Sequence, residues 1–167
     1  LSEMHECGLL TRIFPEFAKV HCRVVRDFYH KYTVDEHTLL AVRGIEALLA
    51  PDGPGRARFA SILQEIHAPE LLTLALLFHD VGKWRESDHA RESLRLAQTM
   101  LDRLELPDDA RRTVEFLIRQ HLAMSQLAFR RDSEDPDAVG RFADLVGTEE
   151  HLKMLCLLTL ADVGAVS

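Results

Sequence analysis

Cysteine is scarce in this chain, and long apolar runs are absent. The 167 residues include three cysteines, which are scattered and form no CxxC pair. This spacing argues against a disulfide framework or a zinc ribbon, and a reducing cytoplasm is the expected location. No apolar stretch reaches the roughly 18 residues that a membrane-spanning helix requires, so no membrane partner is expected.

Basic residues are also few relative to acidic ones. Lysine and arginine total 20, aspartate and glutamate total 27, and the formal net charge is -7. Because nucleic-acid phosphates require a basic face, nucleic acid is not an expected partner. A small phosphorylated substrate held by a metal ion remains compatible with this charge.

The composition indicates one globular domain. Apolar residues make up 47% of the chain and charged residues 28%, and this length can bury a sizeable core. We therefore expect a single domain over residues 1–167. The chain begins without an initiator methionine and ends without a helix stop, so both ends are expected to be cuts within a longer protein.

Apolar residues recur at helical spacing along nearly the whole chain, and no alternating strand pattern is convincing. The pattern predicts an all-α fold of six to eight helices. Expected helices cover approximately residues 4–14, 33–50, 56–66, 69–82, 88–106, 108–120, 136–146 and 148–162. Side chains that favour N-terminal capping mark several starts: a capping box at Thr33 and Glu36, then Ser87 or Asp88, Asp108 and Thr148.

The doublet His79-Asp80 is the most informative feature. It follows an apolar run over residues 71–78 and precedes Val81-Gly82-Lys83. An imidazole and a carboxylate at the end of a buried segment are costly to hide without a partner. A divalent metal ion is the usual partner, although for the doublet alone a satisfied buried pair explains the pattern equally well.

Further histidines and a late aspartate lie near the ends of other predicted helices, where they can converge on the doublet. The candidate metal ligands are His37, His79, Asp80, His89, His121 and Asp162. Nitrogen and oxygen ligands suit Mn, Mg or Fe, with Zn, Co or Ni as alternatives. The absence of cysteine from the set argues against a closed structural zinc site. One ion would be held by His37, His79, Asp80 and Asp162. A second would use His89 and His121 with Asp80 as bridge, unless these two histidines contact phosphate or act as general acid to the leaving oxygen instead.

The ordered set, with His-Asp-x-Gly-Lys and a terminal Leu-Thr-Leu-Ala-Asp, resembles the HD superfamily of metal-dependent phosphohydrolases. Longer segments resemble the central domain of the bifunctional protein-PII uridylyltransferase/uridylyl-removing enzymes. These segments are residues 14–17, 32–39, 77–80, 88–89, 121–125, 130–132 and 157–162.

The resemblance implies an HD-domain helical fold around a metal site. It also implies phosphodiester hydrolysis that removes UMP from the PII signalling protein in nitrogen regulation, within a parent chain that carries nucleotidyltransferase and ACT domains. Metal-activated water would be the nucleophile. The candidate catalytic residues are His79, Asp80, Lys83, His89 and His121.

Candidate substrate contacts are Lys83, Trp84, Arg130 and Arg131. Lys83 would contact phosphate or be a solvated cation at a helix end. Trp84 would stack on uracil or only pack against neighbouring residues. The two arginines would bind a substrate phosphate or an acidic partner, or be ordinary loop charges. Histidines such as His5 and His21 belong to no motif and are expected to be structural or exposed.

Two other functions stay open, namely hydrolysis of a free nucleotide and a non-catalytic, metal-holding regulatory role.

Overall fold

The computed structural model describes residues 1–25, 31–50, 52–85, 88–129 and 135–166. These residues form α-helices and short 3-10 helices, and no strand occurs among them, so the all-α prediction is confirmed. The α-helices are α1 (Ser2–Glu6), α2 (Leu9–Ile13), α3 (Val34–Glu46), α4 (Pro54–Gln64), α5 (Pro69–Phe78), α6 (His89–Leu104), α7 (Asp108–Gln120), α8 (Ala123–Phe129), α9 (Pro136–Val146) and α10 (Glu149–Gly164). The 3-10 helices are η1 (Pro15–Val20), η2 (Ala47–Leu49) and η3 (Val81–Trp84).

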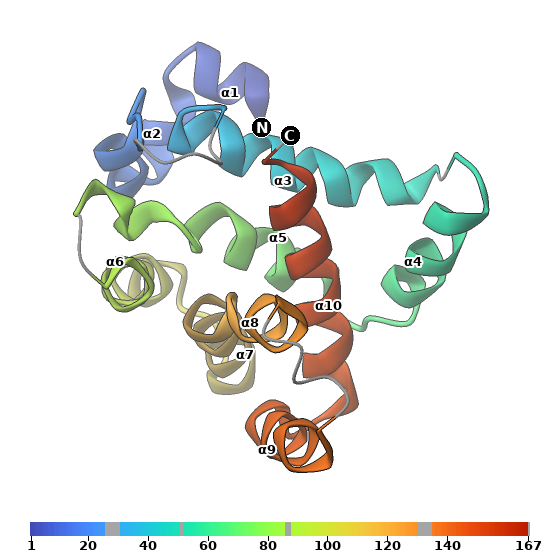
Figure 1. The fold of residues 1–167 in the computed structure, drawn as a ribbon. Coiled ribbons are helices and arrows are strands. Elements are labelled where there is room, and N and C mark those ends of the chain that lie inside the picture. The colour runs from blue at the N-terminus through green and yellow to red at the C-terminus, as the bar shows by residue number, and fades with distance from the viewer. Residues whose placement is uncertain (26–30, 51, 86–87, 130–134, 167) are drawn as a thin grey trace.

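Helix α5 lies at the centre of the core and contacts α3, α6, α7 and α10. Its apolar run is buried on several sides, and Leu72, Ala75, Leu76 and Phe78 are fully inaccessible to solvent. Helix α10 extends from α9 to α3, and α9 lies at the opposite end of the molecule from α1 (Figure 1). In the described ranges, no helix combines the length and apolar character needed to cross a bilayer.

The helix expected over residues 4–14 is two helices, α1 and α2, separated at Gly8. Gly8 has a φ of 72°, in the left-handed region that favours glycine, so the chain turns there instead of continuing. This split and the short helix α8, which the apolar pattern did not predict, raise the number of helices above the six to eight expected.

Two of the predicted side-chain caps form. Asp88 Oδ1 accepts a hydrogen bond from the Arg91 N–H at 3.4 Å, and Thr148 Oγ1 accepts one from the His151 N–H at 3.1 Å. The capping box at Thr33 was wrong, because Thr33 precedes α3 but makes no side-chain cap hydrogen bond. Asp108 does not cap α7 either, because it is the first residue of the helix and Pro107 occupies the N-cap position.

The expected helix 69–82 ends early, at Phe78, and η3 replaces its last turn. The Gly82 N–H donates to Ser93 Oγ on α6 at 2.8 Å instead of to a helix carbonyl. A Cβ atom at Gly82 would overlap the His89 carbonyl oxygen and the Ser93 backbone nitrogen. Glycine is therefore required here so that η3 can approach the start of α6 closely.

The substitution Gly82→Ala should lower the free energy of unfolding by about 2–4 kcal/mol, because the added methyl group meets backbone atoms that cannot rotate away. Chemical denaturation would measure the loss. Gly140→Ala in α9 is the matched control, since its Cβ atom meets nothing within 4 Å, and it should stabilise by about 0.5–1 kcal/mol. Equal effects of the two substitutions would contradict the close approach.

A buried carboxylate joins η3 to α6. Glu92 is 8% exposed and accepts hydrogen bonds from Arg95 Nε at 2.9 Å and Nη2 at 2.8 Å. It also accepts the indole N–H of Trp84 at 3.1 Å. The Arg95 hydrogen bonds, aided by Trp84 and opposed by burial, lower the pKa of Glu92 from 4.5 to about 2.

Glu92→Gln should lower the free energy of unfolding by about 1 kcal/mol at pH 7, because a charge-assisted hydrogen bond becomes a neutral one. The folded pKa is depressed, so Glu92 contributes its full stability above about pH 4.5 and loses it as the pH falls towards 2. Urea denaturation of both proteins between pH 7 and pH 3 should therefore show the difference shrinking with acidity. A difference independent of pH would refute this role of the Glu92 charge.

Candidate metal centre

Six predicted ligands from different parts of the chain meet at one end of α5. His37 comes from α3, His79 and Asp80 from the junction between α5 and η3, and Asp162 from α10. His89 is the first residue of α6 and His121 directly follows α7. These elements converge because α3, α6, α7 and α10 all pack against α5.

The first group consists of His37, His79, Asp80 and Asp162, whose potential ligand atoms all lie within 4.8 Å of one another. Asp162 Oδ1 lies 2.9 Å from His37 Nε2 and 3.4 Å from His79 Nε2. Asp80 Oδ2 lies 3.3 Å from His79 Nε2 and 3.7 Å from His37 Nε2. Asp162 is the most accessible of the four, with 19% of its side chain exposed.

The second group consists of Asp80, His89 and His121. Asp80 Oδ1 lies 3.9 Å from Nε2 of each histidine. His121 is buried, whereas 30% of the His89 side chain is exposed. One oxygen of Asp80 thus faces each group, which is the arrangement that a carboxylate bridging two ions requires.

Backbone carbonyls orient three of the imidazole rings. The Nδ1 atoms of His79 and His121 lie 2.7 Å from the Leu76 oxygen and 2.8 Å from the Ile118 oxygen. His37 Nδ1 lies 3.4 Å from the Ala165 oxygen. Because a carbonyl oxygen can only accept, each Nδ1 is the donor, and Nε2 is the ring nitrogen turned towards the centre. Histidine ligands in metalloproteins are oriented in the same way.

Several polar atoms of the centre are buried and have no hydrogen-bond partner in the described part of the chain. Four of them are His79 Nε2, Asp80 Oδ1, His89 Nε2 and His121 Nε2, and the fifth, Asp80 Oδ2, forms an ion pair with Lys83 Nζ at 2.7 Å. An unsatisfied buried polar atom costs about 1–3 kcal/mol, so four at one point call for a shared partner. A divalent cation fits this set, because all four atoms can act as ligands.

The charges of the centre are strongly coupled. Burial opposes a charge on His79, but the carboxylates of Asp80 and Asp162 prevail and raise the pKa of His79 to about 10. Burial and the charge on His79 lower the pKa of His121 to about 4, and burial likewise lowers the pKa of His89. His89 and His121 are thus neutral at pH 7, as ligands must be. His79 would release its Nε2 proton when an ion binds to that nitrogen.

The predicted substrate contacts differ in position. Lys83 Nζ lies 2.7 Å from Asp80 Oδ2, so this cation is at the centre itself.

Trp84 is partly buried, its N–H is bonded to Glu92, and Lys19 Nζ and Arg85 Cζ each lie 4.6 Å from its ring centroid. Its ring therefore has packing partners, and stacking on uracil stays a prediction. Arg130 and Arg131 lie outside the described residues.

Sequence reasoning missed two features. The carbonyl groups of Leu76, Ile118 and Ala165 orient the rings, but backbone atoms leave no signal in a sequence. A separate group, His5, His21 and Asp35, lies away from the doublet, and its members belong to no motif.

The profile of the HD domain family matches residues 55–163, about two thirds of the chain, so this chain belongs to the HD domain family. HD domains bind divalent metals and hydrolyse their substrates, and the domain is that of a metal-dependent hydrolase. The match includes five of the six predicted ligands, whereas His37 precedes it.

Curated relatives named bifunctional uridylyltransferase/uridylyl-removing enzyme are similar over nearly the whole chain. The protein of Azospirillum brasilense is 38% identical over 99% of this chain and 18% of its own length. Those of Xanthomonas campestris pv. campestris (strain B100) and Xanthomonas axonopodis pv. citri are 39% and 41% identical over 100% of this chain and 19% of theirs. The chain thus spans about a fifth of the length of these relatives.

Because Asp80 faces both groups, its charge should control all metal binding at this centre. Asp80→Asn should weaken Mn²⁺ binding at least tenfold, or about 1.4 kcal/mol, as measured by isothermal titration calorimetry. Asp144→Asn, at an exposed position of α9, is the control and should bind Mn²⁺ like the parent protein. Unchanged affinity in Asp80→Asn would exclude Asp80 as a ligand.

Proposed function

We propose that this domain hydrolyses the phosphodiester bond between UMP and a tyrosine of a PII signalling protein. The observation that carries the proposal is the similarity of the whole chain to proteins named uridylyl-removing enzymes. The clustered metal-binding residues support it, because phosphodiester hydrolysis can be catalysed by divalent ions held in this way.

Two ions are proposed, and they share Asp80. His37, His79, Asp80 and Asp162 would hold one, and His89 and His121 would complete the other. Bound divalent ions supply charge that stabilises the phosphoryl transition state and lowers the pKa of water. In the reaction, a water oxygen attacks phosphorus, the bond from phosphorus to the tyrosyl oxygen breaks, and that oxygen takes up a proton.

The residues of the chain have separate roles in this proposal. The carbonyl-anchored rings of His37, His79 and His121 hold fixed positions, so they form a rigid base for the site. Lys83 places a positive charge beside Asp80, where it would offset negative charge on the phosphate. The partly exposed His89 lies at the solvent side. The lowered pKa of His89 favours a ligand role over that of a general acid, because the ring is neutral at pH 7.

The domain would act within a longer cytoplasmic chain. Its relatives are about five times as long and carry a transferase activity in their name, which supports a flanking nucleotidyltransferase domain. Flanking ACT domains are proposed from the family resemblance alone. The PII protein would be both the partner and the substrate, and its uridylylated tyrosine would reach the centre beside His89.

Uridylylated PII incubated with this protein and Mn²⁺ should release UMP, measured by chromatography. His79→Gln should reduce the rate at least a hundredfold, about 2.7 kcal/mol, because a buried ligand is lost, while His67→Gln should not. His67 is the matched control, because it is an exposed histidine that pairs with Glu150 away from the centre. Release of phosphate groups from free nucleotides without UMP from PII would favour a nucleotide hydrolase, and metal binding without any turnover would favour a regulatory domain.

The rate at a low, fixed Mn²⁺ concentration should fall with acidity, clearly so below about pH 6. Asp80 and Asp162 raise the pKa of His79 to about 10 against the effect of burial, so a proton competes with the ion more strongly at each lower pH. Excess Mn²⁺ should therefore restore activity at pH 6. A rate that is flat from pH 8 to pH 5 would contradict this mechanism.

A further inference from the structure

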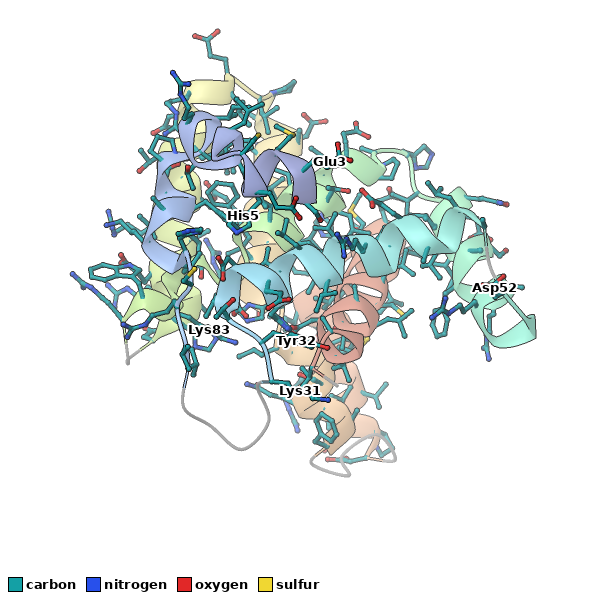
Figure 2. The ribbon with its side chains drawn as sticks, turned by 90° about the horizontal axis from the view of Figure 1, so that it is seen from above. Glu3, His5, Lys31, Tyr32, Asp52 and Lys83 are labelled. Atoms are coloured by element: carbon teal, nitrogen blue, oxygen red, sulfur yellow. The ribbon has the colours of Figure 1, made fainter. Side chains whose placement is uncertain are left out.

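A second convergence of potential ligands lies beside the first turn of α3, and we call it the N-terminal cluster. It consists of His5 from α1, His21 directly after η1, and Asp35 from α3. Asp35 Oδ2 lies 3.1 Å from His5 Nε2 and 3.3 Å from His21 Nδ1. The three potential ligand atoms all lie within 4.8 Å of one another. Figure 2 shows His5 between α1 and the beginning of α3.

We propose that the N-terminal cluster is an accessory site for a divalent transition-metal ion of the zinc type. Two imidazole nitrogens and one carboxylate oxygen form a ligand set that Zn²⁺, Co²⁺ and Ni²⁺ accept readily, whereas Mg²⁺ prefers oxygen ligands alone. The site shares no residue with the centre at Asp80. It would tie α1 and the segment after η1 to the helix that carries His37.

Atoms of the cluster lack the partners that burial demands. Asp35 is 2% exposed, and within the described residues neither a lysine nor an arginine pairs with it. Its Oδ2 accepts the Cys22 N–H at 2.8 Å, but its Oδ1 and His5 Nδ1 are buried without a hydrogen-bond partner. The Cys22 and Glu36 N–H groups and the Thr33 hydroxyl stabilise the Asp35 carboxylate. Among the described residues, however, only the two histidines can offer it positive charge, and a bound divalent cation would balance this buried charge more fully.

The backbone at Cys22 adds to this cost. Cys22 has a φ of 54°, in the left-handed region that a residue with a side chain rarely adopts. The conformation aims the Cys22 N–H at Asp35 and places the preceding residue, His21, beside the same carboxylate. Local strain of this kind occurs preferentially where a ligand is held.

The cluster is also accessible to an ion. His5, Asp35 and Cys22 line a cavity of about 350 Å³, and 55% of the His21 side chain is exposed to solvent. Glu6 and Glu36 line the same cavity against a single arginine, Arg43, so the lining favours a cation. Three protein ligands leave coordination positions for water on the cavity side.

The ion count after equilibrium dialysis against Zn²⁺, measured by mass spectrometry, tests the proposal. The double variant His5→Gln/His21→Gln should bind one Zn²⁺ fewer per chain than the parent protein, because glutamine can still donate to Asp35 but is a poor ligand. The control, His67→Gln, removes an exposed histidine that faces a single carboxylate, and it should bind as many ions as the parent. Equal counts in the double variant and the parent would reduce the cluster to a histidine–carboxylate tether and overturn the proposal.

A second measurement uses the unaltered protein, so its result does not depend on whether the double variant folds. Diethyl pyrocarbonate modifies accessible histidines, and peptide mass spectrometry resolves the rate at each one. At a free Zn²⁺ concentration about ten times the dissociation constant, modification of His21 should slow about tenfold, while His67 should react as before. No protection of His21, or equal protection of both histidines, would refute the site. Neither experiment involves a phosphodiester, so the result is separate from the test of hydrolysis.

Discussion

The carboxylate of Asp80 is the constraint on which the rest of the centre depends. It is 1% exposed, and each of its oxygens faces a different group of histidines. A charge so far from water is tolerable only if cations surround it. Lys83 and a protonated His79 supply positive charge beside it. The same demand for positive charge makes the site attractive to divalent ions, whose ligands are already collected around it.

The surrounding fold places Asp80 at this point and holds it there. Helix α5 is mostly buried after its first two residues and stops at Phe78, so the doublet emerges where four other helices meet. Gly82 then allows η3 to pack closely against α6. This contact places His89 beside Oδ1 of Asp80, whereas His37 and His79 lie beside Oδ2. Carbonyl groups from the ends of α5, α7 and α10 fix the rings that face it. Helix ends serve this purpose because their last carbonyl groups lack partners within the helix.

Much of this could be predicted from the sequence, and the exceptions have physical causes. The all-α fold and the start of α9 at Pro136 follow from periodicity and from local chemistry that acts within a few residues. The convergence of His37 and Asp162 on the doublet was predictable only through family resemblance, because 125 residues separate the two. The break at Gly8 comes from a left-handed backbone that glycine permits, which the apolar period does not reveal. The predicted cap at Thr33 is missing because its side chain hydrogen-bonds to the Asp35 carboxylate instead of to the backbone of α3. No motif indicated that His5, His21 and Asp35 would meet.

Helix α3 connects the two clusters through its own geometry. Asp35 and His37 are two residues apart, and at about 100° per residue their side chains diverge by about 200° around the helix axis. One therefore faces the N-terminal helices while the other faces α5 and α10. Because both side chains begin in the first turns of one rigid helix, a shift of that helix moves them together. On one face of α3, Asp35 contacts α1 and the segment after η1, and on the other, His37 contacts Asp162.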